Sequence, residues 1–297
     1  MKAKTLNLED YINDNRNRVE ECLKNLIPES QVAYRELFTM ARYSLLAPAK
    51  RLRPILALAV AESLSAPSIP LSIPCALELI HTYSIIHDDL PCMDDDDERR
   101  GQPSLHKAYD EAKALLTGDY LLTKAFEVIA SESSITAEQK VALTLSLSKN
   151  CGANGMIGGQ FLDISEVGKE INVDTLRIIH LNKTAAPFIA AVEFGGILAN
   201  APQGTLESLK LFATQIGLGF QIIDDILDVE GESQETGKPT GSDASKDKYT
   251  YVNVMGVAQA REAAEYLYQN AMAALDMIPG DTSLIKNIAS MMIHRNK

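Results

Sequence analysis

Apolar residues recur with a helical period along most of the chain, and this pattern restricts the fold more than any other feature of the sequence. In residues 6–27, for example, the apolar side chains from Leu8 to Leu26 fall on one helical face, and Asn7 is placed to cap that helix. Similar patterns cover residues 53–64, 75–89, 110–130, 136–150, 173–199, 206–229 and 260–275. No series of alternating strands and turn dipeptides stands out. We therefore predict one all-α domain over residues 1–297, built from about ten helices.

Composition narrows the class of partner. The net charge is −12, and phosphate backbones are bound by an excess of Lys and Arg, so we expect no nucleic-acid partner. The four cysteines form no CxxC pair, which favours reduced thiols. The first residues lack the apolar core of a signal peptide, and no apolar run approaches the roughly 18 residues of a membrane span. We expect a cytoplasmic protein without membrane insertion.

The segment His87–Gly101, HDDLPCMDDDDERRG, holds seven acidic residues among fifteen. Two like charges about 4 Å apart repel by about 4 kcal/mol at the effective dielectric of a protein surface, so this charge needs a reason. Asp88 and Asp89 end an apolar helical pattern, and Asp94 follows beyond Pro91, which disturbs ideal helix geometry. For residues 95–97 a solvated acidic loop and a functional role remain equally open.

A second acidic cluster lies far downstream, in FQIIDDILD. Asp224 and Asp228 share a helix face at 3.6 residues per turn, and Asp225 lies beside them. The flanking residues are apolar, so these carboxylates point into a cavity, where unpaired charge is costly. Oxygen ligands without cysteine or paired histidine select hard cations such as Mg²⁺. Two such clusters on facing helices predict a site for several metal ions.

Cationic side chains complete the pattern. Lys50 and Arg53 in AKRLRP are spaced to face one ligand, whereas Arg51 is expected in a surface salt bridge. Lys183 lies in an otherwise apolar helical stretch, which indicates an anionic partner. Two further arginines follow the first cluster and two lysines lie in a Gly-rich loop: Arg99, Arg100, Lys238 and Lys248. Metal-binding carboxylates and cations in one apolar cavity predict a substrate with a diphosphate and a hydrocarbon chain.

The order and spacing of these motifs resemble those of the trans-prenyltransferases (polyprenyl diphosphate synthases) over essentially the whole chain. DDLPCMD is similar to the family's first aspartate-rich motif in its longer DDxxxxD form and is followed by RRG, and DDILD is similar to the second motif. AKRLRP, GGQFLD and KT resemble the family's GGKRxRP, GQxxD and lysine-threonine elements. The likeness is greatest to the bacterial-type farnesyl diphosphate synthases. Pro48 and Ala49 replace the two glycines before Lys50, and Glu98 replaces an apolar residue.

The resemblance implies a role for each matching residue, in an isoprenoid-synthase-type bundle around a central apolar cavity. Mg²⁺, about three ions per site with Mn²⁺ as an alternative, would be bound by Asp88, Asp89, Asp94, Asp224, Asp225 and Asp228. Isopentenyl diphosphate would be bound by Lys50, Arg53, His81 and Arg100. The allylic diphosphate or its metal ions would be contacted by Arg99, Lys183, Thr184, Gln221, Lys238 and Lys248. Lys183, Thr184 and Gln221 would be catalytic, the latter two by stabilising a carbocation.

The implied reaction is a head-to-tail condensation of isopentenyl diphosphate with dimethylallyl and then geranyl diphosphate, in a homodimeric enzyme. The allylic diphosphate leaves, the isopentenyl double bond attacks the cation, and a proton is lost to the departing diphosphate. Tyr83 lies five residues before Asp88, about 7.5 Å along the helix, where an aromatic ring can form the floor of the product tunnel. Neighbouring Ser84 is the second candidate for this role. Resemblance favours a C15 product, with C20 geranylgeranyl diphosphate as the alternative.

Other classes fit less well. A class I terpene cyclase shares the fold and the first motif, but it binds one diphosphate and has no use for the set Lys50, Arg53, His81 and Arg100. A non-catalytic subunit of a heteromeric synthase is expected to lack an intact aspartate motif, and both motifs are intact here. A Ca²⁺ buffer is disfavoured because no DxDxDG loop with a glutamate at its twelfth position occurs.

Overall fold

The structure is a computed structural model that describes residues 7–230 and 249–295. Its helices are α1 (Leu8–Leu26), α2 (Arg35–Leu45), α3 (Leu52–Ser63), α4 (Ser72–Asp88), α5 (Leu105–Ala108), α6 (Glu111–Ser131), α7 (Ala137–Cys151), α8 (Met156–Ser165), α9 (Val173–His180), α10 (Ala186–Leu198), α11 (Gln203–Glu230), α14 (Tyr251–Asp276) and α15 (Ser283–Ile293). A π-helical turn, η1 (Leu181–Ala185), joins α9 to α10, and two short strands, β1 (Glu98–Arg99) and β2 (Gln102–Pro103), pair after α4. The predicted all-α bundle is confirmed.

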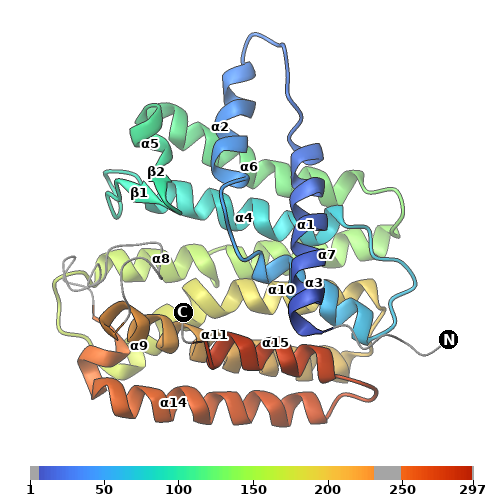
Figure 1. Cartoon of the computed structure of the whole chain (residues 1–297), viewed down its shortest axis with the longest axis vertical. Coiled ribbons are helices and arrows are strands. Elements are labelled where there is room, and N and C mark those ends of the chain that lie inside the picture. Colours follow the sequence, from blue (N-terminus) through green and yellow to red (C-terminus); the bar gives the residue numbers. More distant parts are fainter. Residues whose placement is uncertain (1–6, 231–248, 296–297) are drawn as a thin grey trace.

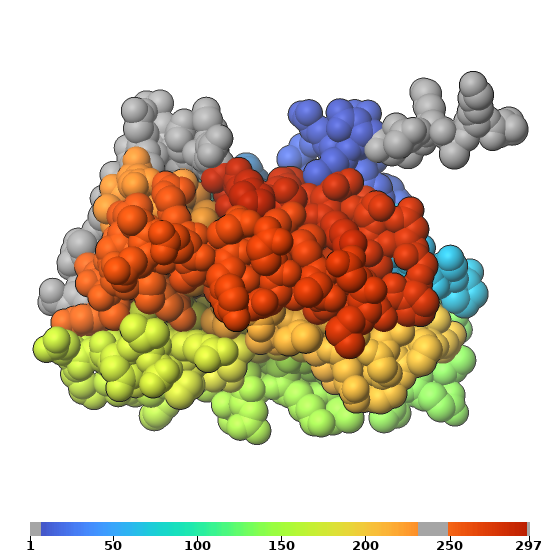
Figure 2. Space-filling view, turned by 90° about the horizontal axis from the view of Figure 1, so that it is seen from below, coloured from blue at the N-terminus to red at the C-terminus, as the bar shows by residue number. Residues whose placement is uncertain are grey.

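The centre of the bundle is built from the helices that are apolar on every side. α3 and α10 bury most of their residues and pack on one another, as such helices must. α4 packs on α6 and α3, and α11 lies between α10 and α14 (Figure 1). In the view from below, α14 and α15 form a continuous orange-to-red layer over one face (Figure 2). The carboxyl ends of α4 and α11 lie at the same end of the bundle (Figure 1), and α11 also contacts η1.

Local signals explain where several elements begin. Asn7 caps α1 by accepting a hydrogen bond from the backbone N–H of Glu9, as its position predicts. Pro54 stands in the first turn of α3, where its missing N–H leaves no bond unmade. The hairpin β1–β2 departs from the prediction of helices and loops alone. Its two-residue turn, Arg100–Gly101, has positive φ at both positions, the conformation that matches the twist of paired strands.

The predicted helix over residues 173–199 is interrupted by η1. Pro187 has no N–H to donate to the carbonyl of Lys183 four residues earlier, and its ring crowds that carbonyl. A wider turn just before the proline relieves this conflict. Among the described residues, no helix is long and apolar enough to cross a membrane. All four cysteines are free thiols, as predicted.

Candidate active site

The first aspartate cluster is shaped by a tight turn at the end of α4. The backbone N–H of Asp94 donates to the carbonyl of Asp88 over 2.8 Å, and the carbonyl of Leu90 accepts from Met93 and Asp95. The chain thus folds back on itself past Pro91. This brings Asp94 next to Asp88, a placement that helix periodicity could not supply across a proline.

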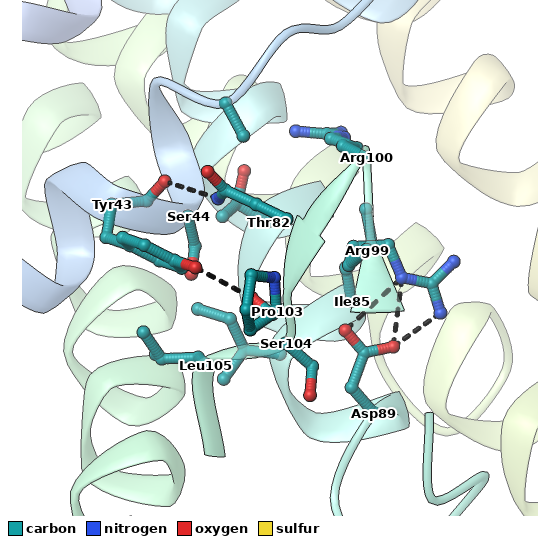
Figure 3. Close-up of a pocket in the computed structure, with 13 residues that line it drawn as sticks. Tyr43, Ser44, Thr82, Ile85, Asp89, Arg99, Arg100, Pro103, Ser104 and Leu105 are labelled. Carbon is teal, nitrogen blue, oxygen red and sulfur yellow. Dashed lines mark hydrogen bonds and ion pairs between the residues drawn. The ribbon is translucent and has the colours of Figure 1, made fainter. Parts of the chain in front are cut away.

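Asp89 faces the hairpin instead. Its buried carboxylate accepts hydrogen bonds from Nε of Arg99 at 3.0 and 3.2 Å, and Nη2 of Arg99 bonds it as well (Figure 3). Nη2 also donates to Asp96 at 2.8 Å. Burial acts to lower the pKa of Arg99, but the bonds and charges of the two aspartates together raise it. The carboxylate of Asp89 therefore anchors a guanidinium that remains charged.

The second strand of the hairpin is held by α2. The hydroxyl of Tyr43 donates to the carbonyl of Pro103 at 2.9 Å, and the side chain of Gln102 donates to the carbonyl of Tyr43 at 3.2 Å. These contacts line a recess under the hairpin that also includes Thr82 and Asp89 (Figure 3). The hairpin is thus fixed from both sides, and Arg99 and Arg100 are fixed with it.

The three aspartates of the second cluster have different surroundings. The side chain of Asp224 is half exposed and pairs with Nη2 of Arg295 at 2.6 Å. Asp225 is buried and accepts from the side-chain amide of Gln221 at 2.9 Å and from the backbone N–H of Tyr251 at 3.0 Å. Asp228 lies one turn beyond Asp224 on the same face, as predicted. Asp225 therefore joins α11 to α14, while Asp224 faces the open side of the site.

The turn η1 connects the two clusters. Nζ of Lys183 lies 2.6 Å from the carboxylate of Asp163 on α8. The hydroxyl of Thr184 donates to the side-chain oxygen of Gln221 on α11 at 2.8 Å. Because the Gln221 amide in turn donates to Asp225, its oxygen and nitrogen are both assigned. Thr184 and Gln221, which were predicted to act together, are in direct contact.

Two glycines allow η1 to approach its neighbours. An added Cβ at Gly159 of α8 would collide with the backbone of Lys183, and one at Gly217 of α11 would lie 2.5 Å from Cα of Ala185. Each glycine precedes a partner of η1 by one helical turn, Asp163 on α8 and Gln221 on α11. The close backbone contact and the polar contact are therefore made by the same face of each helix.

The pKa of Lys183 is also affected by the first aspartate cluster. Burial acts to lower its pKa, but the carboxylates of Asp163, Asp88 and Asp94 together outweigh burial and raise the pKa above its usual range. Such an influence requires these carboxylates to lie near the ammonium group. Lys183 therefore stays cationic at neutral pH among these carboxylates, and its role in binding an anionic ligand stays a prediction.

Arg51 differs from its expected surface position. Its side chain is buried, donates to Glu78 at 2.7 Å, and bonds the carbonyls of Leu45 and Ala47 at 2.8 and 3.0 Å. Arg51 thereby closes the loop that contains both Pro48 and Lys50. The expectation failed because the partner, Glu78, lies on another helix, α4.

Glu78 is also near the cations predicted for isopentenyl diphosphate. Nη2 of Arg100 lies 3.8 Å from its carboxylate. Burial lowers the pKa of Arg53 to about 10, with Glu78 opposing and Arg100 adding to the shift, so this guanidinium remains charged at neutral pH. Burial and the charges of Arg53 and Arg100 hold the pKa of His81 well below its usual range. The structure therefore brings Arg53, Arg100 and His81 together, and the His81 imidazole is neutral.

The remaining predicted residues are the isopentenyl-diphosphate ligand Lys50, the chain-length candidates Tyr83 and Ser84, and the two lysines of the Gly-rich loop. Lys50 lies near Asp224 and Arg295: its pKa is lowered by burial and by Arg295, and raised by Asp224. Tyr83 is buried in α4, and Ser84 donates to the carbonyl of His81 at 2.9 Å. Lys238 and Lys248 lie outside the described residues.

Three comparisons with known proteins agree with this geometry. Residues 34–283 match the family model described as polyprenyl synthetase. The chain is 43% identical to the farnesyl diphosphate synthase of Haemophilus influenzae over 262 residues, covering 87% of this chain and 88% of that protein. It is 38% identical to the geranylgeranyl diphosphate synthase of Cyanophora paradoxa over 294 residues, covering 98% and 97%. A crystal structure of the Helicobacter pylori geranyltransferase with magnesium and isoprenyl diphosphate superposes with a TM-score of 0.85 at 32% identity, covering 99% and 98%.

This chain belongs to the polyprenyl synthetase family, and its fold is that of the isoprenyl synthases. The relatives include synthases of farnesyl diphosphate and of geranylgeranyl diphosphate. These are the C15 and C20 products that the sequence left as alternatives.

Three residues of the site were missed from the sequence. Asp163 had a signal, because it ends the GGQFLD element. Glu78 had a weaker one, as a single acidic residue inside an apolar helix. Arg295 had none, because an isolated arginine near the end of a chain is ordinary. Its ring contact, 4.0 Å above Phe220, depends on the packing of α15 beside α11.

Proposed function

We propose that the chain condenses isopentenyl diphosphate with dimethylallyl and then geranyl diphosphate to give (2E,6E)-farnesyl diphosphate. The observation that carries this proposal is the division of the cations into two groups, one beside the first aspartate cluster and one around Glu78. Lys183 faces Asp88, Asp94 and Asp163, whereas Arg53 and Arg100 gather at Glu78. A site with two groups of cations suits a reaction with two diphosphates. Most of the chain is also similar to a farnesyl diphosphate synthase.

The donor set fits Mg²⁺, which we propose at about three ions per site, with Mn²⁺ as an alternative. Asp88 and Asp94 lie side by side at the end of α4, and Asp224 is half exposed. Asp89 and Asp225 serve first as partners of Arg99 and Gln221. When bound, Mg²⁺ would neutralise charge that develops on the leaving diphosphate.

The protein's own groups supply the remaining electrostatics. Lys183 holds a fixed positive charge near the first cluster, where we place the allylic diphosphate. The chain Thr184–Gln221–Asp225 fixes the Gln221 amide, whose oxygen dipole can stabilise an allylic cation. In the condensation the allylic C–O bond breaks, a C–C bond forms, and a proton leaves the isopentenyl unit. Fixed dipoles assist this step because they need no reorganisation as the charge develops.

Product length is the finer part of the proposal. Tyr83 is buried in α4 and packs edge-on against His87, with ring centroids 5.6 Å apart. Within the part of the chain that the structure describes, its hydroxyl has no hydrogen-bond partner. Burial raises its pKa, followed by the charges of Cys151 and Asp88. A rigid ring below Asp88 supports an early end to the growing chain. The second candidate is the C20 product geranylgeranyl diphosphate, because the Cyanophora paradoxa relative is a geranylgeranyl diphosphate synthase.

The test is an incubation of labelled isopentenyl diphosphate with dimethylallyl diphosphate and Mg²⁺, followed by chromatography of the dephosphorylated products. We expect farnesol as the main alcohol. Geranylgeraniol as the main product would overturn the C15 proposal but keep the family activity. Label that stays in isopentenyl diphosphate, without any elongated alcohol, would contradict the proposal as a whole.

We also propose a homodimer, in which residues 1–297 of each copy act as one domain. One contiguous apolar core extends from Val19 in α1 to Ile293 in α15, which supports the single domain. Large apolar side chains are exposed on α6, α7 and α8, including Leu116, Val141 and Phe161, the last 74% exposed. Such residues are typical of surfaces that bind another chain. Sedimentation equilibrium gives the oligomeric state of the wild type and of Phe161→Glu. We expect a dimer for the wild type and a shift towards monomer for the variant.

A further inference from the structure

A third set of ligands lies at the base of the hairpin, outside both aspartate clusters. Asp95, Asp97 and His106 each offer one atom, and these atoms lie within 4.8 Å of one another. Nε2 of His106 is 3.9 Å from Oδ1 of Asp95. We propose that these three residues bind a divalent transition-metal ion of the Zn²⁺ type. This ion is additional to any Mg²⁺ held with the substrates.

His106 points to a ligand independently of the acidic residues. The residue is more than nine-tenths buried, yet its Nε2 has no hydrogen-bond partner among the described residues. Its other ring nitrogen, Nδ1, lies 3.1 Å from the hydroxyl of Ser104. Metal-binding histidines usually hold the second ring nitrogen in this way, which fixes the ring. Because a buried ring nitrogen without a partner is unfavourable, a cation between His106 and Asp95 would satisfy both groups.

The geometry allows closure on an ion. Ligand atoms about 2.0–2.2 Å from zinc lie about 3.4 Å from one another in a tetrahedral site, so the observed spacing must contract slightly. The side chains of Asp95 and Asp97 are 59% and 75% exposed, which leaves them free to rotate towards the fixed ring. Nζ of Lys107 lies 2.8 Å from Asp97 and 3.9 Å from Asp95. This exposed lysine competes with the metal ion and can swing into solvent.

The ligand types decide which metal fits. Imidazole nitrogen suits Zn²⁺, Co²⁺ or Ni²⁺, whereas Mg²⁺ prefers oxygen ligands alone. The ligands flank the hairpin, because Asp95 and Asp97 precede β1 and His106 follows β2. A bound ion would close the segment that carries Arg99 and Arg100. The backbone N–H of Ser104 already donates to the carbonyl of Asp97 at 2.9 Å, so the two ends are near each other.

The experiment measures Zn²⁺ binding to the chelator-stripped full chain by calorimetry, in excess Mg²⁺ to occupy oxygen-only sites. We expect one ion per chain, and a thermal midpoint that rises on adding it. Asp95→Asn should weaken binding at least about tenfold, because mutating even an outer-shell partner of a metal ligand costs about 10–100-fold in affinity. Asn also tolerates the positive φ of Asp95, so this variant should fold. His106→Gln should abolish the thermal shift, and Lys107→Gln should tighten binding.

His294→Gln is the matched control. His294 also pairs with a carboxylate, Glu265 at 3.0 Å, but the described residues place no third ligand beside this pair. Zn²⁺ binding should remain unchanged in this variant. Equal Zn²⁺ affinity in wild type, Asp95→Asn and His106→Gln would overturn the proposal, as would the absence of stoichiometric binding in wild type. Because the readout is Zn²⁺ affinity without substrate, its failure leaves the proposed prenyl transfer untouched.

Discussion

Gly217→Ala tests whether backbone contact between α11 and η1 positions Thr184 and Gln221, the pair that we propose to be catalytic. The new Cβ would lie 2.5 Å from Cα of Ala185 and 2.6 Å from its Cβ. Ordinary carbon contacts are about 3.5–4.0 Å, so the two elements must separate by about 1 Å. Overpacking of this kind costs about 1–3 kcal/mol, partly offset by the better helix propensity of alanine. The bond from Thr184 to Gln221, now 2.8 Å, would lengthen beyond hydrogen-bonding range.

We therefore expect kcat to fall about 10²-fold, the scale seen for a 1 Å misplacement near a reacting centre. The thermal midpoint should fall by several degrees, at about 2–4 °C per kcal/mol. Gly204→Ala on the same helix is the matched control, because nothing lies within 4 Å of its added Cβ. It should keep wild-type kcat and stability. Equal kinetics and melting for the two variants would refute the close-contact reasoning.

Four further outcomes follow from the site. Arg53→Ala should mainly raise KM for isopentenyl diphosphate, whereas Lys183→Ala should mainly lower kcat; identical steady-state profiles would contradict two diphosphate subsites. Chelating divalent ions, or Asp88→Ala, should lower turnover at least about 10²-fold, and near-normal turnover with chelator would exclude the metal role. Tyr83→Ala should lengthen the product, read by chromatography, and an unchanged C15 product would exclude the tunnel floor. Burial lowers the pKa of His180 to about 4, with Lys183 adding to the shift and Asp163 opposing it. The unfolded state therefore binds the extra proton first, and stability should fall by up to about 3 kcal/mol between pH 6.5 and 4, measured by urea unfolding. His180→Gln should flatten that slope.

Helices and clusters could be predicted from the sequence because their signals are local. The period of apolar residues fixes a helix over 206–229, and spacing alone puts Asp224 and Asp228 on one face. What separates Asp224 from Asp225 is not local. Asp225 is bound by the backbone N–H of Tyr251, 26 residues later on α14, and Asp224 by Arg295. Adjacent aspartates thus differ through partners that only the tertiary fold brings to them.

The hairpin and Arg51 illustrate the same limit. Arg100–Gly101 is not one of the usual turn dipeptides, so a two-residue β-turn had no clear sequence signal. It forms because Tyr43 of α2 and Asp89, the residue after α4, hold its two strands. Arg51 reads as a surface residue beside Lys50, yet its partner Glu78 lies on α4. In both places a long-range hydrogen bond overrides the local pattern.

The acidic stretch after α4 is tolerated because its aspartates face in different directions. Asp88 and Asp94 lie near Lys183, and Asp89 and Asp96 accept hydrogen bonds from Arg99. Asp95 and Asp97 lie near His106 and Lys107. Pairing does not consume Arg99, because bonding through Nε and Nη2 leaves its Nη1 amino group for a second anion. If Arg99 binds the allylic diphosphate as predicted, Asp89 and Asp96 orient this cation towards it rather than neutralise it. Asp89→Asn should consequently weaken diphosphate binding even though it removes negative charge, and tighter binding in that variant would show that repulsion by Asp89 dominates.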